Sequence, residues 1–306
     1  MPSLAHARRG VALASIAGIG VNRPASSEPL ARRGAGSEIT GVADRVHEAH
    51  GITTASLAAG AARAALAASG ADPSGIEMII VATTTPDVLW PATACLVQTD
   101  LQLPMVAAFD LYGAQAGMLT AVNVATHYVA AGAGTVLVIG AECDRQLVDL
   151  PGQGHLVHAR AAAAAVLQAG DAGGGILSTV VGGAARSTAD GDSHTGLVEG
   201  ISDAARACVQ QAGMDLADID LVLADAGAPD VMRDWASRAG VRGDRLLLDP
   251  DRYGTLLAAA PFVILRDLAS AGRLNDGMTV LMLECGAGPV WAAACLKWHG
   301  TVMREW

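Results

Sequence analysis

Two stretches of the sequence decide the fold, because each one repeats the other. Residues 61–87 read AARAALAASGADPSGIEMIIVATTTPD, and residues 204–230 read AARACVQQAGMDLADIDLVLADAGAPD. They align without a gap at a separation of 143 residues and share the AARA start, a Gly-x-Asp turn, an isoleucine and a Pro-Asp end. Self-similarity of this kind indicates a duplicated structural unit.

The repetition continues beyond these stretches. At a separation of 144 residues, TVLVIG at 135–140 matches TVLMLE at 279–284. The motif DLYG at 110–113 resembles DRYG at 251–254, and each is followed by about 20 apolar residues that are compatible with a helix. The repeated unit therefore extends over most of each half of the chain.

Each unit has the pattern helix, buried strand, loop, buried helix, buried strand and then a further strand, at 161–167 or 290–296. The candidate strands are near-continuous apolar runs rather than alternating ones, which is typical of a sheet covered on both faces. The pattern predicts an α/β protein whose halves are related by a pseudo-twofold axis. Two central helices, at roughly 113–131 and 254–271, are expected to lie back to back.

The composition excludes several classes of protein. Of the 306 residues, 52% are hydrophobic and only 16% are charged, so the chain has ample apolar surface to bury and is not intrinsically disordered. A formal charge of −10 argues against binding to nucleic acid, which needs a basic footprint. Five cysteines without CxxC spacing, and an N-terminus without a signal-peptide pattern, favour the cytoplasm, with no metal site and no disulfide framework.

One segment imitates a membrane span. Residues 111–141 contain no Asp, Glu, Lys or Arg, and the segment is long enough to cross a bilayer. Polar residues such as Gln115 interrupt it, however, and the Gly-Ala-Gly sequence at 132–134 divides it into a helix-compatible part and a β-rich part. We therefore expect a buried helix followed by a buried strand, and no association with a membrane.

A set of motifs connects the chain to a known family. They are IEMIIVATTTPDVLWPATACLVQTDLQLP from residue 76, AAFDLYGAQAGM from residue 107, GTVLVIGAE from residue 134, and the C-terminal YGTLLAAA and DGMTVLMLECGAGPVW. Together they resemble the β-ketoacyl-ACP synthase III enzymes of the thiolase superfamily, over roughly residues 40–298. The resemblance implies a thiolase-like duplicated αβαβα layered fold, with pseudo-twofold related halves at 1–170 and 171–306.

The resemblance also implies a catalytic site, and the residues depart from it. Members of the family carry an acyl group on a cysteine thiolate, decarboxylate malonyl-ACP and condense the two, while a histidine and an asparagine stabilise the enolate-like charge. Position by position, the cysteine falls on Gln115, the histidine on Asp225 and the asparagine on Thr255. All three catalytic positions are substituted. The backbone amides of Gln115 and Ala287 are expected to face each other as an oxyanion hole.

Trp90 matches an aromatic residue that, in this family, crosses the dimer interface into the acyl pocket of the partner subunit. Two interpretations stay open: Trp90 is a core residue of a dimer interface, or it shapes the active site of a neighbouring subunit. The segment that supplies a Trp and an Arg for the CoA nucleotide is shortened, and its remnant at 38–43 contains neither residue. The resemblance therefore does not extend to CoA binding, and no cofactor is expected.

Three functional hypotheses follow. The first is a pseudoenzyme that serves as the non-condensing subunit of a heterodimer with an active ketoacyl synthase III-like subunit, in the biosynthesis of fatty-acid or polyketide-type specialised metabolites. The second is a homodimeric acyltransferase, thioester hydrolase or decarboxylase that uses Gln115 and Asp225, with Asp225 as a general base. The third is a module that binds an acyl thioester or an acyl carrier protein without turning it over.

Three further residues have a chemical and a structural interpretation. Asp110 precedes a predicted helix, and we expect it to cap that helix. Cys143 and Cys285 come just past equivalent strands, where each is interpreted either as a residue that lines the active site or as a small buried hydrophobic residue.

Overall fold

The structure of the protein is a computed structural model. The described residues are 13–22, 52–143, 160–170, 174–184, 194–224, 227–249, 253, 256–286, 290–299 and 302–305.

Among these residues, six strands form the first sheet, in the order β11-β1-β5-β4-β2-β3. They are β1 (Leu13–Asn22), β2 (Ile76–Ala82), β3 (Ala107–Leu111), β4 (Thr135–Glu142), β5 (Ala161–Gly170) and β11 (Val302–Glu305). β2 pairs in parallel with both β3 and β4, so the carboxyl ends of these three strands meet at one end of the sheet. In the described part of the chain, β3 lies at one edge of this sheet and β11 at the other.

The second sheet contains, in the described part of the chain, five strands in the order β6-β10-β9-β7-β8. They are β6 (Gly175–Gly183), β7 (Leu221–Ala224), β8 (Leu246–Leu247), β9 (Thr279–Gly286) and β10 (Val290–Lys297). β7 pairs in parallel with β8 and β9, just as β2 pairs with β3 and β4. The second sheet therefore repeats the pairing of the first, in agreement with the sequence repeat.

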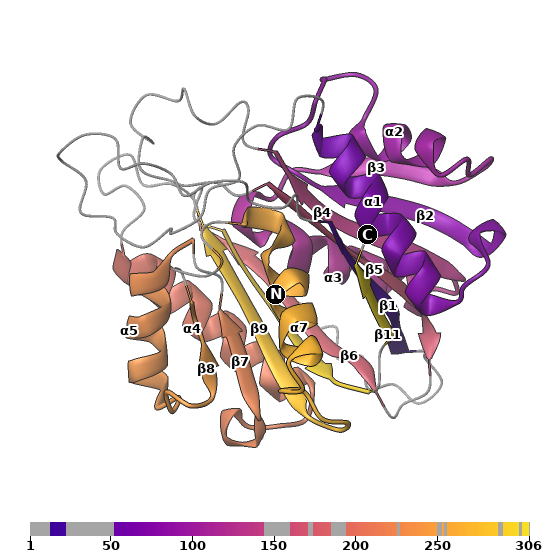
Figure 1. The fold of residues 1–306 in the computed structure, drawn as a ribbon. Helices are drawn as coiled ribbons and strands as arrows, with labels where there is room; N and C mark the ends of the chain where they lie inside the picture. The colour runs from indigo at the N-terminus through magenta and orange to yellow at the C-terminus, as the bar shows by residue number, and fades with distance from the viewer. Residues whose placement is uncertain are drawn as a thin grey trace.

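The helices lie between the two sheets and on their outer faces (Figure 1). α3 (Gly117–Ala130) and α7 (Ala260–Ser270) form the central layer and contact strands of both sheets. The outer helices are α1 (Thr54–Ser69) and α2 (Thr93–Asp100) on the first sheet, and α4 (His194–Gln211) and α5 (Pro229–Ala239) on the second. The predicted αβαβα layering is confirmed.

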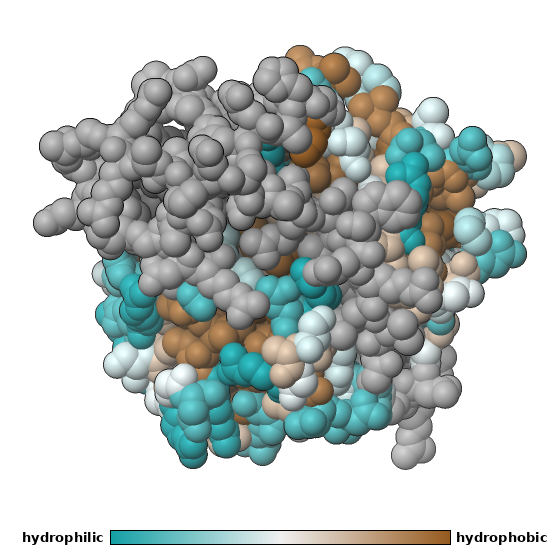
Figure 2. Space-filling view, viewed as in Figure 1, coloured by the Kyte–Doolittle hydropathy of each residue, from teal (hydrophilic) through white to brown (hydrophobic). Residues whose placement is uncertain are grey.

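The outer helix α5 shows why these elements pack as layers. It buries Val231, Met232, Trp235 and Ala236 on one face. Its opposite face is polar, as the teal residues over α5 in Figure 2 show. A helix with one apolar face is stable only when that face lies against another element, here α4 and the second sheet.

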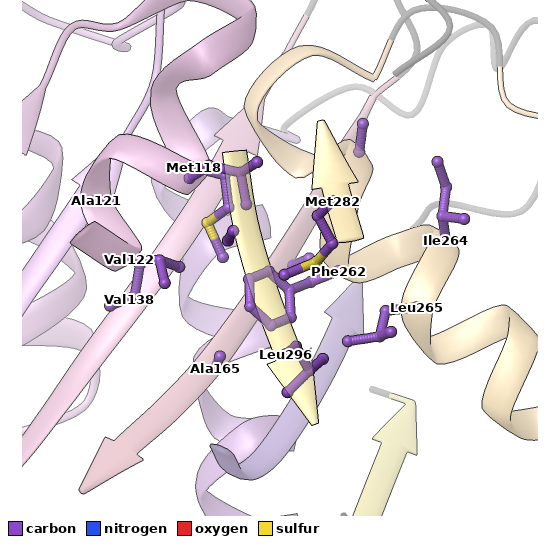
Figure 3. Packing of buried hydrophobic residues seen from close by; sticks show 14 of the residues in the cluster. Met118, Ala121, Val122, Val138, Ala165, Phe262, Ile264, Leu265, Met282 and Leu296 are labelled. Atoms are coloured by element: carbon purple, nitrogen blue, oxygen red, sulfur yellow. The ribbon is translucent and has the colours of Figure 1, made fainter. Parts of the chain in front are cut away.

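Between the sheets the described core is mostly aliphatic, and the ring of Phe262 lies within it. Phe262 of α7 is fully buried and lies among Met118, Met282 and Leu296 (Figure 3). Small residues let the backbones approach closely: a Cβ atom at Gly140 of β4 would collide with the backbone of α7's preceding turn. The Ala- and Gly-rich composition therefore permits two helices to fit between two sheets.

Each central helix is preceded by a 3-10 turn, η2 (Ala114–Ala116) and η5 (Leu257–Ala259). Two other short 3-10 turns, η1 (Pro73–Gly75) and η4 (Leu216–Asp218), each lie just before a strand. The first residues of η2 and η5 have left-handed φ angles, 46° at Ala114 and 48° at Leu257. A left-handed residue cannot belong to a right-handed helix, so the central helices begin a few residues later than predicted.

Two buried glutamates connect the repeats crosswise. Glu142 ends β4 of the first repeat and accepts a hydrogen bond from the backbone N–H of Ala258, in η5 of the second. Glu284 lies in β9 of the second repeat, and its Oε2 accepts the backbone N–H of Leu119, in the first turn of α3, at 3.0 Å. Each repeat therefore supplies a carboxyl group near the start of the other repeat's central helix, to the 3-10 turn before α7 in one case and to the first turn of α3 in the other.

Glu142 also connects the loop that follows β2. It accepts hydrogen bonds from the backbone N–H of Thr84 at 3.0 Å, from the Thr84 hydroxyl at 2.9 Å and from the Thr85 hydroxyl at 2.8 Å. Burial nevertheless raises the pKa of Glu142 to about 7, because the loss of hydration outweighs these bonds.

The segment at 111–141 divides as predicted, into α3 and β4. No helix of the described residues is both long and apolar enough to span a membrane. The strands β1, β3, β6, β8 and β11 were not predicted. β11 pairs in parallel with β1, so residues near the C-terminus join the sheet of the first repeat.

The raised pKa of Glu142 predicts a specific pH dependence of stability. In the unfolded chain this carboxyl loses its proton near pH 4.5, whereas in the folded protein it keeps the proton until about pH 7. Its contribution to stability is therefore complete below pH 4.5 and is lost as the pH rises to about 7. The total is about 3 kcal/mol, at 1.36 kcal/mol for each unit of pKa.

The measurement is chemical denaturation of the protein and of Glu142→Gln at both ends of this range. We expect the free energy of unfolding of the protein, relative to the variant, to fall by a few kcal/mol from low to neutral pH. Glu77→Gln, at an exposed glutamate of β2, is the matched control and should show no such change. A pH profile of Glu142→Gln that is parallel to that of the protein would contradict the assignment.

Candidate functional site

Gln115 lies in the tight turn between β3 and α3, and its side chain is buried. The turn brings the chain close to itself, since a Cβ atom at Gly113 would lie 2.8 Å from the Cα of Gly117. Ala114, directly before Gln115, adopts the left-handed φ of 46°. Backbone strain of this kind costs on the order of 1 kcal/mol in a non-glycine residue and is concentrated at functional sites. The turn that presents residue 115 is therefore a strained one.

The carboxamide of Gln115 packs against Gly286, the last residue of β9. A Cβ atom at position 286 would lie 2.8 Å from the Cβ of Gln115 and would overlap its Cδ and Oε1 atoms. Only glycine leaves room for this side chain. Gln115 therefore fills the space between the start of α3 and the end of β9.

Polar groups gather where parallel strands end, as is common for sites in α/β proteins. Thr84 and Thr85 follow β2, Gln115 follows β3, and Glu142 ends β4. Hydrogen bonds join Glu142 to both threonines. Glu142 and Glu284 were not predicted as site residues. The available signal was a charged residue within an otherwise apolar strand, in TVLVIGAE and in TVLMLE.

Three of the predicted site residues, Asp225, Thr255 and Ala287, lie outside the described residues. Their roles, and the facing of the amides of Gln115 and Ala287, stay predictions. The described neighbours Ala224 and Gly286 end the parallel strands β7 and β9.

Trp90 lies on the surface, in the loop before α2, with 87% of its area exposed. This loop is held to β3 by Asp110, whose carboxylate accepts the backbone N–H groups of Thr93 at 2.7 Å and Ala94 at 2.8 Å. Asp110 therefore caps α2, which precedes it in the chain, and the prediction that it caps the following helix is wrong. The cap depends on β3 running past the start of α2, a long-range contact that local sequence does not reveal.

Other large apolar side chains around β3 are also exposed. Met105 before the strand is 91% exposed, Tyr112 after it is 78% exposed, and Leu89 beside Trp90 is 88% exposed. We call Leu89, Trp90, Met105, Tyr112 and the edge of β3 the β3 surface. Large exposed apolar patches mark interaction sites in soluble proteins.

Four of the five cysteines are buried, whereas Cys95 is partly exposed. Cys143 and Cys285 each lie within a hydrophobic cluster. Alternate residues of a strand point to opposite faces, so Cys285 faces the outer helices and not Gln115. Burial raises the pKa of Cys208 to about 11 and that of Cys295 to about 12. Within the described residues, no group of three His, Cys, Asp or Glu side chains is placed to hold a metal ion.

Comparison with known sequences agrees with this architecture. Residues 109–185 match the profile of the family 3-oxoacyl-[acyl-carrier-protein (ACP)] synthase III, and residues 209–298 match that of its C-terminal region. A β-ketoacyl-[acyl-carrier-protein] synthase III of Symbiobacterium thermophilum is 33% identical over 295 residues, which cover 85% of this chain and 88% of that protein. The β-ketoacyl-[acyl-carrier-protein] synthase III 2 of Streptomyces coelicolor is 32% identical, over 85% of this chain and 84% of its own.

Comparison with solved structures gives the same answer. The 3-oxoacyl-[acyl-carrier-protein] synthase III of Aquifex aeolicus superposes with a TM-score of 0.83 at 26% sequence identity, and covers 93% of this chain and 100% of its own. The duplicated layers of the fold and these matches agree with each other. The chain belongs to the β-ketoacyl-ACP synthase III family of the thiolase superfamily.

Proposed function

We propose that this chain is the non-condensing subunit of a heterodimer whose other subunit is an active synthase of the same family. The observation that carries the proposal is the glutamine at position 115, buried at the start of α3 with its carboxamide against Gly286. In the family motif this position holds the nucleophilic cysteine. A carboxamide cannot form a thioester, so an acyl-enzyme of the family's kind cannot form here.

The two other substitutions support the same proposal. Where the motif has a histidine that donates a hydrogen bond, this chain has Asp225, and an ionised aspartate only accepts hydrogen bonds and repels a developing enolate. Where the motif has an asparagine, the chain has Thr255. All three catalytic groups of the motif are absent, while the scaffold is retained. This combination favours the loss of the whole condensation reaction over a change in a single step of it. The backbone amides of Gln115 and Ala287 stay part of the proposed site as hydrogen-bond donors.

The β3 surface is the face that we assign to the partner. An edge strand offers unpaired backbone groups to another chain, and the aromatic and aliphatic side chains beside it offer apolar area. Asp110 fixes the loop of Trp90 to this strand, so Trp90 is presented beside the edge. Trp90 would then line the acyl pocket of the active subunit, while the acyl thioester or acyl carrier protein is bound and processed there.

The proposal also sets a metabolic context. An active partner would use acyl thioesters in a pathway of fatty-acid or polyketide type. We assign a specialised-metabolite pathway, because a primary pathway needs the catalytic residues intact. We also propose that the chain consists of two halves, 1–170 and 171–306, and that both halves belong to the same subunit.

The experiment is purification of the tagged chain from its source cell, with identification of bound proteins by mass spectrometry. We expect an equimolar partner of the same family whose sequence contains the cysteine, histidine and asparagine. A chain that purifies only with itself, with no homologue that carries these residues, would contradict the heterodimer.

Activity assays on the isolated chain separate the remaining hypotheses. Turnover of acyl thioesters that is lost in Asp225→Asn would favour altered acyl chemistry with Asp225 as the base. A ligand-induced thermal shift with acyl-ACP, without turnover, would favour a binding module. The heterodimer proposal expects neither result.

The β3 surface generates a first prediction. Trp90→Ala should weaken association with the partner by about 30-fold or more, since buried aromatic anchors contribute about 2 kcal/mol or more to an interface. Val181→Ala, at an exposed aliphatic residue of β6 in the other sheet, is the matched control and should bind normally. Affinity is measured with purified subunits by calorimetry. Equal affinities of the two variants would exclude Trp90 from the interface.

The packing of Gln115 generates a second prediction. Gly286→Ala should lower the free energy of unfolding by about 1–3 kcal/mol, because the new methyl group overlaps the carboxamide. In a Gln115→Gly background every overlapping side-chain atom is absent, so the same substitution should cost at least about 1 kcal/mol less. A denaturation double-mutant cycle measures the difference. Costs that are equal in both backgrounds would show that the Gln115 side chain does not lie against Gly286.

A further inference from the structure

The loop between β2 and α2 carries two of the exposed side chains of the β3 surface. Leu89 is 88% exposed and Trp90 is 87% exposed. Large side chains in a loop lose conformational freedom when a partner binds, and this ordering opposes association. The contacts at the two ends of the loop therefore decide how much ordering is left for the binding step.

The first end of the loop is held by Asp87. Its Oδ1 accepts the backbone N–H of Thr54 at 2.8 Å, and its Oδ2 accepts that of Ala55 at 2.8 Å. Thr54 and Ala55 are the first two residues of α1, so the helix itself leaves these two donors unpaired. Two residues before Asp87, the hydroxyl of Thr85 donates to Glu142 of β4 at 2.8 Å. The chain that enters the loop is therefore bound both to α1 and to β4.

The second end of the loop is held by Asp110 with the same geometry. One carboxylate oxygen accepts the N–H of Thr93 at 2.7 Å, and the other accepts that of Ala94 at 2.8 Å. These are the first two residues of α2, which lies against β3, the strand that carries Asp110 (Figure 1). Only residues 88–92 separate Asp87 from α2, so Trp90 lies between two points that are each bound by both oxygens of an aspartate.

The contacts of Asp87 do more than cap a helix. α1 already has a local cap, because Thr53 Oγ1 accepts the N–H of Ser56 at 3.1 Å and Ser56 Oγ accepts the N–H of Thr53 at 2.9 Å. Asp87 is 33 residues from Thr54 in the sequence. Its carboxylate is therefore a tertiary connection between the loop and α1.

We propose that Asp87 is a positioning residue for Trp90: together with Asp110 it fixes both ends of the loop, so that the backbone of Trp90 is ordered before the partner subunit binds. An anchor that is ordered in advance loses less conformational entropy on association. The ordering follows from the contacts of this chain alone. Its effect on association rests on the proposed function, in which the β3 surface binds an active synthase.

The first test measures the backbone order parameter of Trp90 in the isolated chain, by NMR relaxation after labelling with isotopic tryptophan. The signal is assigned by its absence in Trp90→Phe. A rigid backbone gives about 0.85 and a flexible one less than about 0.6. Although Trp90 is exposed, we expect about 0.85, as for the buried Trp235, and a fall to about 0.6 in Asp87→Ala. A flexible Trp90 in the parent chain, or an unchanged value in Asp87→Ala, would overturn the proposal.

Thr53→Ala is the matched control. It removes the local cap of α1 but leaves both hydrogen bonds of Asp87 in place, so the order parameter of Trp90 should not change. Equal falls in Thr53→Ala and Asp87→Ala would show that the loop responds to a weakened α1, and would overturn the proposal. Asp87→Asn keeps one accepting oxygen and should give an intermediate value, which provides the comparison if Asp87→Ala does not fold.

The second test measures association with the active subunit. Asp87→Ala should weaken it by about 5- to 10-fold, which corresponds to the ordering of about one large side chain. In a Trp90→Ala background the same substitution should change the affinity by less than about 2-fold, because Asp87 acts through Trp90. Equal losses in both backgrounds would overturn the proposal.

The two tests also separate this inference from the proposed function. A parent chain that binds no synthase subunit contradicts the heterodimer. A flexible Trp90 in the isolated chain contradicts the positioning role of Asp87 alone.

Discussion

The crosswise capping of the two central helices is the constraint on which the rest of the structure depends. Glu142 reaches from β4 to the turn before α7, and Glu284 reaches from β9 to the first turn of α3. A buried carboxyl group without hydrogen bonds would cost several kcal/mol. Glu142 accepts hydrogen bonds from groups of both repeats, and Glu284 accepts one from the other repeat. The two repeats are therefore parts of one core rather than two independent domains.

The candidate site lies where β9 of the second repeat meets the start of α3 of the first. The strained turn at Ala114, the glycine at the end of β9 and the carboxyl group of Glu284 all converge on residue 115. Here the Gln115 side chain fills the space beside Gly286, and Glu284 accepts a hydrogen bond from the first turn of α3.

The sequence repeat was sufficient to predict the layers, the buried strands β2, β4 and β9, and the helix-plus-strand division at 111–141. It could not predict β1 and β11, because their pairing joins residues from opposite ends of the chain. Asp110 was assigned to the wrong helix for the same reason, since its partners are brought to it by the packing of α2 on β3. Gln115 was found from its motif, whereas the hydrogen bond of Glu284 joins it to Leu119, 165 residues away in the sequence.

The proposal that this chain carries no acyl group is tested most directly by the intact mass of the isolated chain after incubation with acyl-CoA and with acyl-ACP. An active synthase gains the mass of the acyl group, which stays on its nucleophile. For this chain the expected result is an unchanged mass with every acyl donor. An acyl adduct that maps to a side chain of the site, with release of the donor thiol, would contradict a subunit that carries no acyl group.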